Sequence, residues 1–347
     1  MYKIAYLIVF TTLLFTACKK DEPVTSGNEI PIVQSEASYP VLIDENVVYA
    51  EGLGHTGAST SSFPVSLLLD VYYPDNNSTN RPVFMFIHGG GFQGGTKTKP
   101  EIVNMANFYA SRGWVFASID YRTVEELGTI TGMTQAEVRT FHNGIAPEEW
   151  INFSLQNAMS PDEVQTSIAI YAAQRDAKAA LRWLVANSET YNSNNDFITV
   201  GGASAGAIST IALGISDQDN FRDEISVTDD PTLLSTNIDE PYDVKSMIYF
   251  WGADVKLELY EAIYGINLYD MNDPELFMAH GTMDVNSSTP FSEATELKDI
   301  YDSLSIYNEL VPLEGAGHGA WNAQVDGKGL NELTFDFLVE RQNLMVE

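Results

Sequence analysis

Short apolar runs recur along the chain, and each one ends near a turn signal. Residues 83–87 are apolar without interruption and follow Pro82, which is the pattern of a strand buried on both faces of a sheet. By the same reasoning, further strands are predicted at residues 65–73, 114–119, 197–200, 247–250, 276–278 and 307–313.

Helical spacing of apolar residues fills the intervals between these strands. Residues 168–187 show it most clearly, because alanines, leucines and a valine follow one another at intervals of three and four. Other helices are predicted at residues 100–112, 207–215, 290–304 and 329–346. Strands that alternate with helices predict an α/β fold: a mostly parallel, twisted sheet with helices on both faces. One domain over residues 45–347 accounts for all of these elements.

One long segment interrupts the alternation. Residues 123–166 mix polar and aromatic residues with glycines and prolines, between a predicted strand and a predicted helix. A connection of this length inside a compact domain is usually functional. We therefore expect a lid insertion at 123–166. A second, acidic insertion is expected at 216–243.

The N-terminal sequence is typical of an export signal. Lys3 precedes an apolar run at 4–17, which is too short for an ordinary membrane span and suits a signal peptide over residues 1–17. The small residues before Cys18, the only cysteine, resemble a bacterial lipobox, so Cys18 is the predicted lipidation site; the alternative is an ordinary signal peptide with an incidental cysteine. The lipidated cysteine and a polar, flexible tether are expected over residues 18–44.

The large excess of acidic side chains limits which molecules the protein can bind. The chain carries 48 acidic and 18 basic side chains, for a formal net charge of -30. Such a surface repels nucleic acid and anionic lipid, so we expect no nucleic-acid partner and no membrane contact except the lipid anchor. The expected location is that of an exported bacterial lipoprotein on the outer membrane or cell surface, with the periplasmic face left open.

The first chemical signal is the sequence Gly-Ala-Ser-Ala-Gly at 202–206, between a predicted strand and an apolar helix. A serine hydroxyl is a poor nucleophile unless a base can take its proton. A sharp strand-to-helix turn exposes the hydroxyl, and its flanking glycines avoid a clash with the neighbouring backbone. Ser204 is therefore the candidate nucleophile.

The second signal is His-Gly-Gly-Gly-Phe at 88–92, also directly after a strand. Ester hydrolysis builds negative charge on the carbonyl oxygen, and backbone N–H groups stabilise that oxyanion when the main chain can approach it. The alternative is a glycine-rich strand end without a catalytic role.

Two further motifs supply an acid and a base. Asp284 ends the sequence His-Gly-Thr-Met-Asp after the strand at 276–278, with Asp254 and Asp326 as rival acids. A carboxylate there would hold an imidazole in its useful tautomer. His318 lies in the glycine-rich sequence at 315–319 and is the candidate base.

The other histidines fit the role of base less well. His88 and His280 look like structural hydrogen-bonding residues at strand ends, whereas His55 and His142 lie outside any motif. The order serine, aspartate, histidine is that of the α/β-hydrolase arrangement.

With these motifs the chain resembles the α/β-hydrolase superfamily, and within it the bacterial esterases and lipases of the carboxylesterase and hormone-sensitive-lipase type, over residues 65–345. The segments at 115–122 and 174–184 also look like elements of that family. The resemblance implies the α/β-hydrolase fold, with Ser204 as nucleophile, His318 as base and Asp284 as acid. It also implies an oxyanion hole, which is made by the N–H groups of Gly90, Gly91 and Ala205, with Gly89 as an open alternative.

The predicted function is a serine carboxylic ester hydrolase that acts through an acyl-enzyme on small-molecule or polysaccharide-linked esters outside the cell. Acetyl or feruloyl esters of polysaccharide and short-acyl esters of broad scope are the candidate substrates. No cofactor or metal is expected, because the acidic stretch at 216–243 lacks the ligand pattern of a calcium loop. The competing functions are a serine peptidase of the superfamily and a non-catalytic binding module on the same fold.

Overall fold

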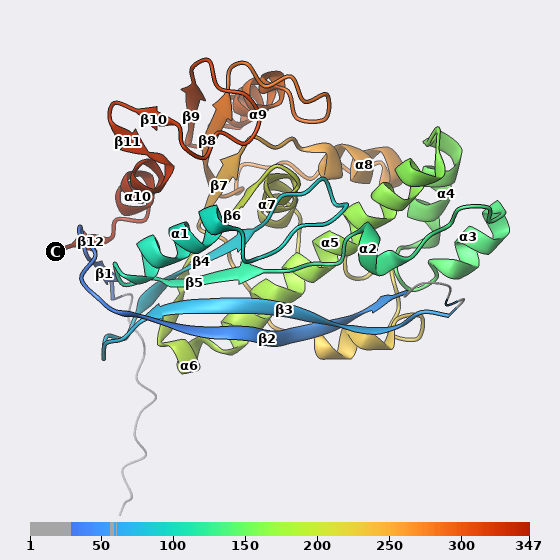
Figure 1. Cartoon of the computed structure of the whole chain (residues 1–347), viewed down its shortest axis with the longest axis horizontal. Coiled ribbons are helices and arrows are strands. Elements are labelled where there is room, and N and C mark those ends of the chain that lie inside the picture. The colour runs from blue at the N-terminus through green and yellow to red at the C-terminus, as the bar shows by residue number, and fades with distance from the viewer. Residues whose placement is uncertain (1–28, 56–58, 60) are drawn as a thin grey trace, which may run out of the picture.

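The computed structural model describes residues 29–55, 59 and 61–347, so the signal peptide predicted at 1–17 and the lipidation site predicted at Cys18 lie outside the described residues. The described chain is built on an eight-stranded sheet with strand order β2-β3-β5-β4-β6-β7-β8-β9 (Figure 1). These strands are β2 (Val41–Gly54), β3 (Phe63–Pro74), β4 (Arg81–Ile87), β5 (Val115–Ile119), β6 (Ser193–Ala203), β7 (Ser246–Phe250), β8 (Glu275–Gly281) and β9 (Asn308–Leu313).

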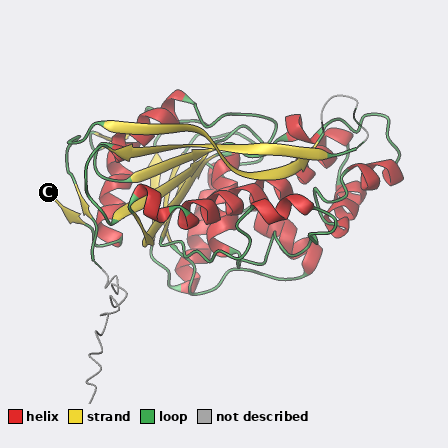
Figure 2. Cartoon of the chain, turned by 90° about the horizontal axis from the view of Figure 1, so that it is seen from below, coloured by secondary structure: helices red, strands yellow, loops and turns green. Residues whose placement is uncertain are grey.

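The sheet is mostly parallel and strongly twisted. Strand β3 is antiparallel to both of its neighbours, β2 and β5, whereas every pairing from β5 across to β9 is parallel. In Figure 2 the strands fan out across one another, which is the appearance of a twisted sheet. Every residue of β4, β5 and β7 is buried, which confirms the prediction that the run at 83–87 lies between two covering layers.

Helices cover both faces of the sheet. They are α1 (Pro100–Ala110), α2 (Val124–Leu127), α3 (Gln135–Phe141), α4 (Glu148–Asn157), α5 (Pro161–Ala186), α6 (Ser188–Tyr191), α7 (Ala205–Ile215), α8 (Val255–Tyr264), α9 (Phe291–Leu304) and α10 (Leu330–Arg341), with a 3₁₀ helix, η1, at Pro231–Ser235. One core lies under α1 and α10, and a larger core on the opposite face lies under α5, α7, α8 and α9 (Figure 1). The predicted architecture is thereby confirmed. In the part of the chain that is described, no helix combines the length and apolar character needed to span a bilayer.

The expected flexible tether at 18–44 needs a correction. Strand β1 (Ile32–Val33) pairs in parallel with β12 (Met345–Val346), and Val33 is fully buried. Strand β2 begins at Val41, where the register pairs Val41 with Pro74. The described residues from 29 onward are therefore part of the folded domain. The local sequence pattern did not predict β1 and the start of β2, because each pairs with residues that are distant in sequence.

The expected lid at 123–166 is a layer of short helices. It contains α2, α3, α4 and the first turns of α5. Helix α5 begins at Pro161 rather than at 168, because the Ser160 side chain caps the helix by accepting a hydrogen bond from the Glu163 N–H. Leu127, Ile145 and Trp150 in this segment are fully buried and belong to the larger core. The segment is therefore packed as part of the domain.

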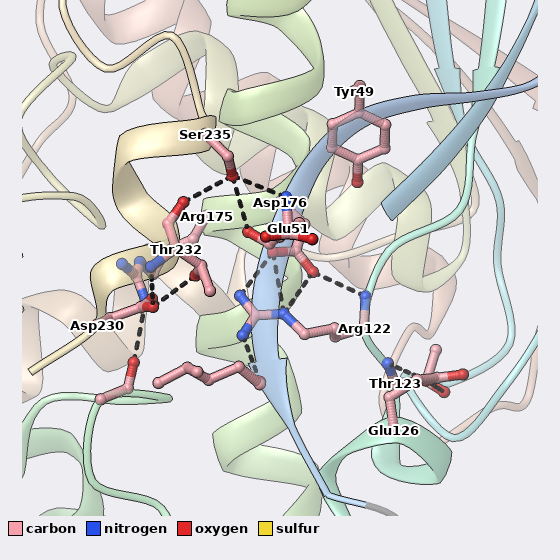
Figure 3. A network of polar contacts seen from close by, with 12 residues as sticks. Tyr49, Glu51, Arg122, Thr123, Glu126, Arg175, Asp176, Asp230, Thr232 and Ser235 are labelled. Carbon is pink, nitrogen blue, oxygen red and sulfur yellow. Dashed lines mark hydrogen bonds and ion pairs between the residues drawn. The ribbon is translucent and has the colours of Figure 1, made fainter. Parts of the chain in front are cut away.

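A buried ionic network ties the larger core to the edge of the sheet (Figure 3). Arg122, just after β5, makes a two-pronged contact with Asp176 of α5, with nitrogen–oxygen distances of 2.6 and 2.9 Å, and donates to the carbonyl of Leu53 in β2 at 2.7 Å. Arg175 of α5 reaches Asp230 at 3.0 Å, in the acidic segment at 216–243. Removing one partner of such a buried pair costs about 3–5 kcal/mol, because the other charge is left uncompensated.

The first prediction concerns the buried His142. Burial lowers the pKa of His142 from 6.5 to about 4, so the folded ring stays neutral while the ring in the unfolded chain takes up a proton below pH 6.5. The unfolded state then binds more protons, and stability falls as the pH drops from 6.5 towards 4. At pH 5 this residue accounts for a loss of about 2 kcal/mol.

We expect His142→Phe to remove that share of the acid sensitivity. The measurement is urea unfolding of both proteins at pH 7 and pH 5, compared as the change in unfolding free energy between the two pH values. An equal change in the two proteins would contradict the assignment.

Candidate active site

The nucleophile turn joins β6 to α7. Ser204 has φ 56° and ψ −122°, a conformation that a residue with a side chain rarely adopts, and its N–H donates to the Phe250 carbonyl at 2.9 Å. A Cβ on Gly206 would lie 2.0 Å from the Ile87 carbonyl oxygen, and one on Gly202 would lie 2.3 Å from the backbone of Gly206. Gly206 is thus required for α7 to pack this tightly against the end of β4, and Gly202 is required for β6 to lie this close to the first turn of α7.

The predicted base and acid meet at this turn. Nε2 of His318 lies 3.0 Å from Oγ of Ser204, and Nδ1 of His318 lies 2.8 Å from Oδ2 of Asp284. The Asp284 side chain is completely buried, whereas 30% of the His318 side chain is exposed. The structure therefore brings Ser204, His318 and Asp284 into one hydrogen-bonded chain that opens to solvent at the histidine.

The rival acids lie in other contacts. Asp254 accepts a hydrogen bond from the Tyr269 hydroxyl at 2.7 Å. Asp326 has φ 52° in the turn between β10 (Gln324–Val325) and β11 (Lys328–Gly329). Asp284 is the one of the three candidates that contacts His318.

The glycine-rich loop after β4 lies beside the nucleophile. Gly90 and Gly91 have positive φ angles of 145° and 63°, and Ala205 is the first residue of α7. Among the described residues, no protein acceptor takes the N–H of Gly90, Gly91 or Ala205. Gly89 also lies close, because a Cβ there would be 3.0 Å from Cβ of Ser204. The loop thus offers unpaired backbone donors next to the serine.

His88 fixes the start of this loop. Its Nδ1 lies 3.0 Å from the Gly89 carbonyl, which can only accept, so Nδ1 carries the proton. The ring stacks on Tyr121 at 4.4 Å, and the Tyr121 hydroxyl donates to the His88 carbonyl at 2.9 Å. Burial lowers the pKa of His88 to about 4, so the ring remains neutral at physiological pH. His88 has the structural role expected from the sequence.

Of two buried polar groups near the site, sequence reasoning missed Lys256 and predicted a structural hydrogen-bonding role for His280 without naming its partner. Lys256 of α8 donates to Gln174 and to Ser209 of α7, at 3.0 and 2.7 Å, and burial lowers its pKa well below 10.5. His280 contacts Asp284, although its place in the motif at 280–284 suggested a structural residue only. No sequence signal marks Lys256, whereas the four-residue spacing of His280 and Asp284 was visible. The described residues contain no group of three or more metal-ligand side chains in a metal-binding arrangement.

A family model matches more than half of the chain. The model of the BD-FAE family matches residues 69–135 and 163–300, which is more than half of the chain and includes Ser204 and Asp284. The chain belongs to the BD-FAE family, an esterase family. The matched part of this BD-FAE chain ends before His318, so the structure alone relates the base to the other two residues.

Two curated relatives resemble parts of this BD-FAE chain. A para-nitrobenzyl esterase of Bacillus subtilis (strain 168) is 26% identical over 147 residues, which is 42% of this chain and 24% of that protein. The neuroligin-like protein glit-1 of Caenorhabditis elegans is 25% identical over 174 residues, which is 49% of this chain and 16% of that protein. The chain thus spans a quarter or less of the length of these relatives.

Solved structures share the fold. A thermophilic esterase of the planctomycete Thermogutta terrifontis, bound to propionate, is 20% identical with a TM-score of 0.55, over 85% of this chain and 93% of that one. A truncated carbohydrate esterase from gut microbiota is 17% identical with a TM-score of 0.53, over 90% and 99% of the two chains. At these identities the likeness concerns the fold, and it confirms the predicted α/β-hydrolase fold.

The close packing at the nucleophile turn yields a second prediction. Gly206→Ala forces a Cβ into the backbone at the end of β4, so we expect the free energy of unfolding to fall by about 1–3 kcal/mol or more. Gly317→Ala is the matched control, because the nearest atom to its added Cβ would be 4.0 Å away. Urea unfolding measures both. Equal stability of the two variants would show that the turn has more room than the structure gives it.

Proposed function

We propose that this chain is a serine carboxylic ester hydrolase that works through an acyl-enzyme on esters outside the cell. The observation that carries the proposal is the hydrogen-bonded chain from Ser204 through His318 to Asp284, with contacts of 3.0 and 2.8 Å. Its position beside unpaired backbone donors and the membership in an esterase family support the same chemistry.

In the first step, Oγ of Ser204 attacks the ester carbonyl while Nε2 of His318 takes the serine proton. Buried Asp284 stabilises the imidazolium that forms, and it holds the ring with Nε2 facing the serine. The carbonyl oxygen gains a negative charge, and the free N–H groups of Gly90, Gly91 and Ala205 are placed to donate to it.

In the second step, the tetrahedral intermediate collapses. The bond to the alkoxy oxygen breaks, and His318 gives its proton to the departing alcohol, which leaves an acyl group on Ser204. A water molecule then attacks the acyl carbonyl while His318 again accepts a proton. The bond from the acyl carbon to Oγ breaks, His318 returns the proton to Ser204, and the carboxylic acid is released. The open side of His318 provides a path for alcohol and water.

We further propose that the natural substrates are neutral esters on extracellular carbohydrate, such as acetyl or feruloyl esters. The fold shared with a carbohydrate esterase supports this class, and the net charge of -30 disfavours anionic substrates. We also propose that a signal peptide at 1–17 and lipidation of Cys18, both expected from the sequence, anchor the enzyme through lipid at the outer membrane or cell surface, with the periplasmic face left open.

The proposal predicts the behaviour of Ser204→Ala. We expect the rate of ester hydrolysis to fall by about 10⁴-fold or more, with an unchanged thermal unfolding temperature, because the small side chain is replaced without new contacts. Ser303→Ala, at an exposed serine of α9, is the control and should keep wild-type activity.

The assay is a panel of p-nitrophenyl esters of increasing acyl length, beside acetylated xylan, methyl ferulate and a p-nitroanilide peptide. A fluorophosphonate probe should label the wild type and the control but not Ser204→Ala. An unlabelled wild-type protein would indicate a binding module, and cleavage of the peptide alone would indicate a peptidase.

A further inference from the structure

A second histidine contacts the acid of the candidate active site. Nε2 of His280, near the end of β8, lies 3.1 Å from Oδ2 of Asp284. The same oxygen faces Nδ1 of His318 at 2.8 Å. The other oxygen, Oδ1, accepts from the backbone N–H of Asn286 at 2.9 Å. One buried carboxylate thus lies between two imidazole rings.

The hydrogen-bond partners fix the tautomer of His280. Its Nε2 also lies 3.1 Å from the carbonyl oxygen of Thr289, which can only accept a hydrogen bond. A ring nitrogen that faces a carbonyl and a carboxylate must carry the proton and donate to both. Nδ1 of the same ring is buried and has no partner among the described residues, so a neutral ring protonated at Nε2 satisfies the contacts.

Thr289 closes a ring of contacts around the carboxylate. Its carbonyl accepts from His280, while its hydroxyl lies 3.3 Å from Nδ1 of His318. Thr289 is 2% exposed and His280 is fully buried. The two histidines, the aspartate and the threonine are therefore fixed relative to one another without contact to bulk water at the carboxylate.

We propose that His280 is a positioning residue, whose Nε2–H holds the carboxylate of Asp284 in the orientation that faces His318. This inference rests on the proposed function, because it assigns a role within the same site. A wholly buried carboxylate needs hydrogen-bond donors for its oxygens, and His280 supplies one of the three that the structure shows. Since His280 does not touch the nucleophile, it acts through Asp284.

The groups that face His280 come from each neighbouring element. Asp284 and His318 lie on the loops after β8 and β9, Tyr249 of β7 has its ring 6.0 Å away, and Phe291 of α9 stands edge-on at 5.8 Å. Burial lowers the pKa of His280, and the nearby carboxylate only partly offsets this effect. The His280 ring therefore stays neutral at pH 7.

Loss of the Nε2 donor leaves Oδ2 of Asp284 with one N–H donor, that of His318, and removes the contact that holds the carboxylate in its present orientation. Misalignment of Asp284 lowers kcat and leaves KM nearly unchanged, because the substrate does not touch the carboxylate.

A matched pair of amides tests the proposal. The side-chain nitrogen of His280→Gln reaches the position of Nε2, whereas that of His280→Asn is too short. We expect the glutamine variant to keep kcat within about threefold of wild type, and the asparagine variant to lose about 10- to 100-fold in kcat with KM nearly unchanged. Equal behaviour of the two variants, whether active or impaired, would overturn the proposal.

A readout on the wild-type protein is independent of how the variants fold. Nitrogen-15 NMR of the histidine-labelled protein at pH 7 should show His280 as a neutral ring protonated at Nε2. A ring protonated at Nδ1, or a charged ring, would contradict the assignment. If the wild type hydrolyses no ester and reacts with no fluorophosphonate, the proposed function fails. If it does both and the two variants match it, the role of His280 alone fails.

Discussion

The close approach of α7 to the end of β4 is the constraint on which the site depends. Helix α7 can start directly after β6 only because Gly202 and Gly206 carry no Cβ, since an added carbon would lie within 2.3 Å of backbone atoms in both cases. The strain is concentrated in Ser204, whose positive φ points its hydroxyl out of the turn. The same packing sets the first N–H of α7 beside the glycine loop that follows β4. One backbone contact thus positions both the candidate nucleophile and the candidate oxyanion donors.

Buried polar groups hold the rest of the site, and each is stabilised by specific partners. Asp284 remains in a buried position because N–H groups of His318, His280 and Asn286 face its two oxygens. Arg122 and Asp176 neutralise each other between the sheet and α5. Such groups add little net stability, but each one permits few arrangements of its neighbours. This explains how loops from β8 and β9 can present an aspartate and a histidine at hydrogen-bonding distance to a serine on β6.

Several elements were predictable because their signal is local. The largely apolar strands β4, β5 and β7 are buried on both faces, and the motifs at 202–206, 280–284 and 315–319 lie at or just after the ends of strands, as expected. The first part of β2 was assigned to a tether, because residues 41–46 lack a clean alternation and the strand gains its partner from residues 71–74. The start of α5 was placed too late, because the polar first turns after Ser160 hide a helix that its cap and Pro161 begin.

The sequence by itself determined the fold class and the chemical types at the site: a serine between glycines, a glycine-rich loop after a strand, and an aspartate and a histidine in that order. These are local properties, set by residue identity and by the strands that precede each motif. Only the tertiary structure decided that Asp284 rather than Asp254 or Asp326 faces His318, and that His280 shares the same carboxylate oxygen. The physical reason is that hydrogen bonds between loops depend on the register of neighbouring strands and on burial. Neither can be inferred from the local sequence around residues that lie dozens of positions apart.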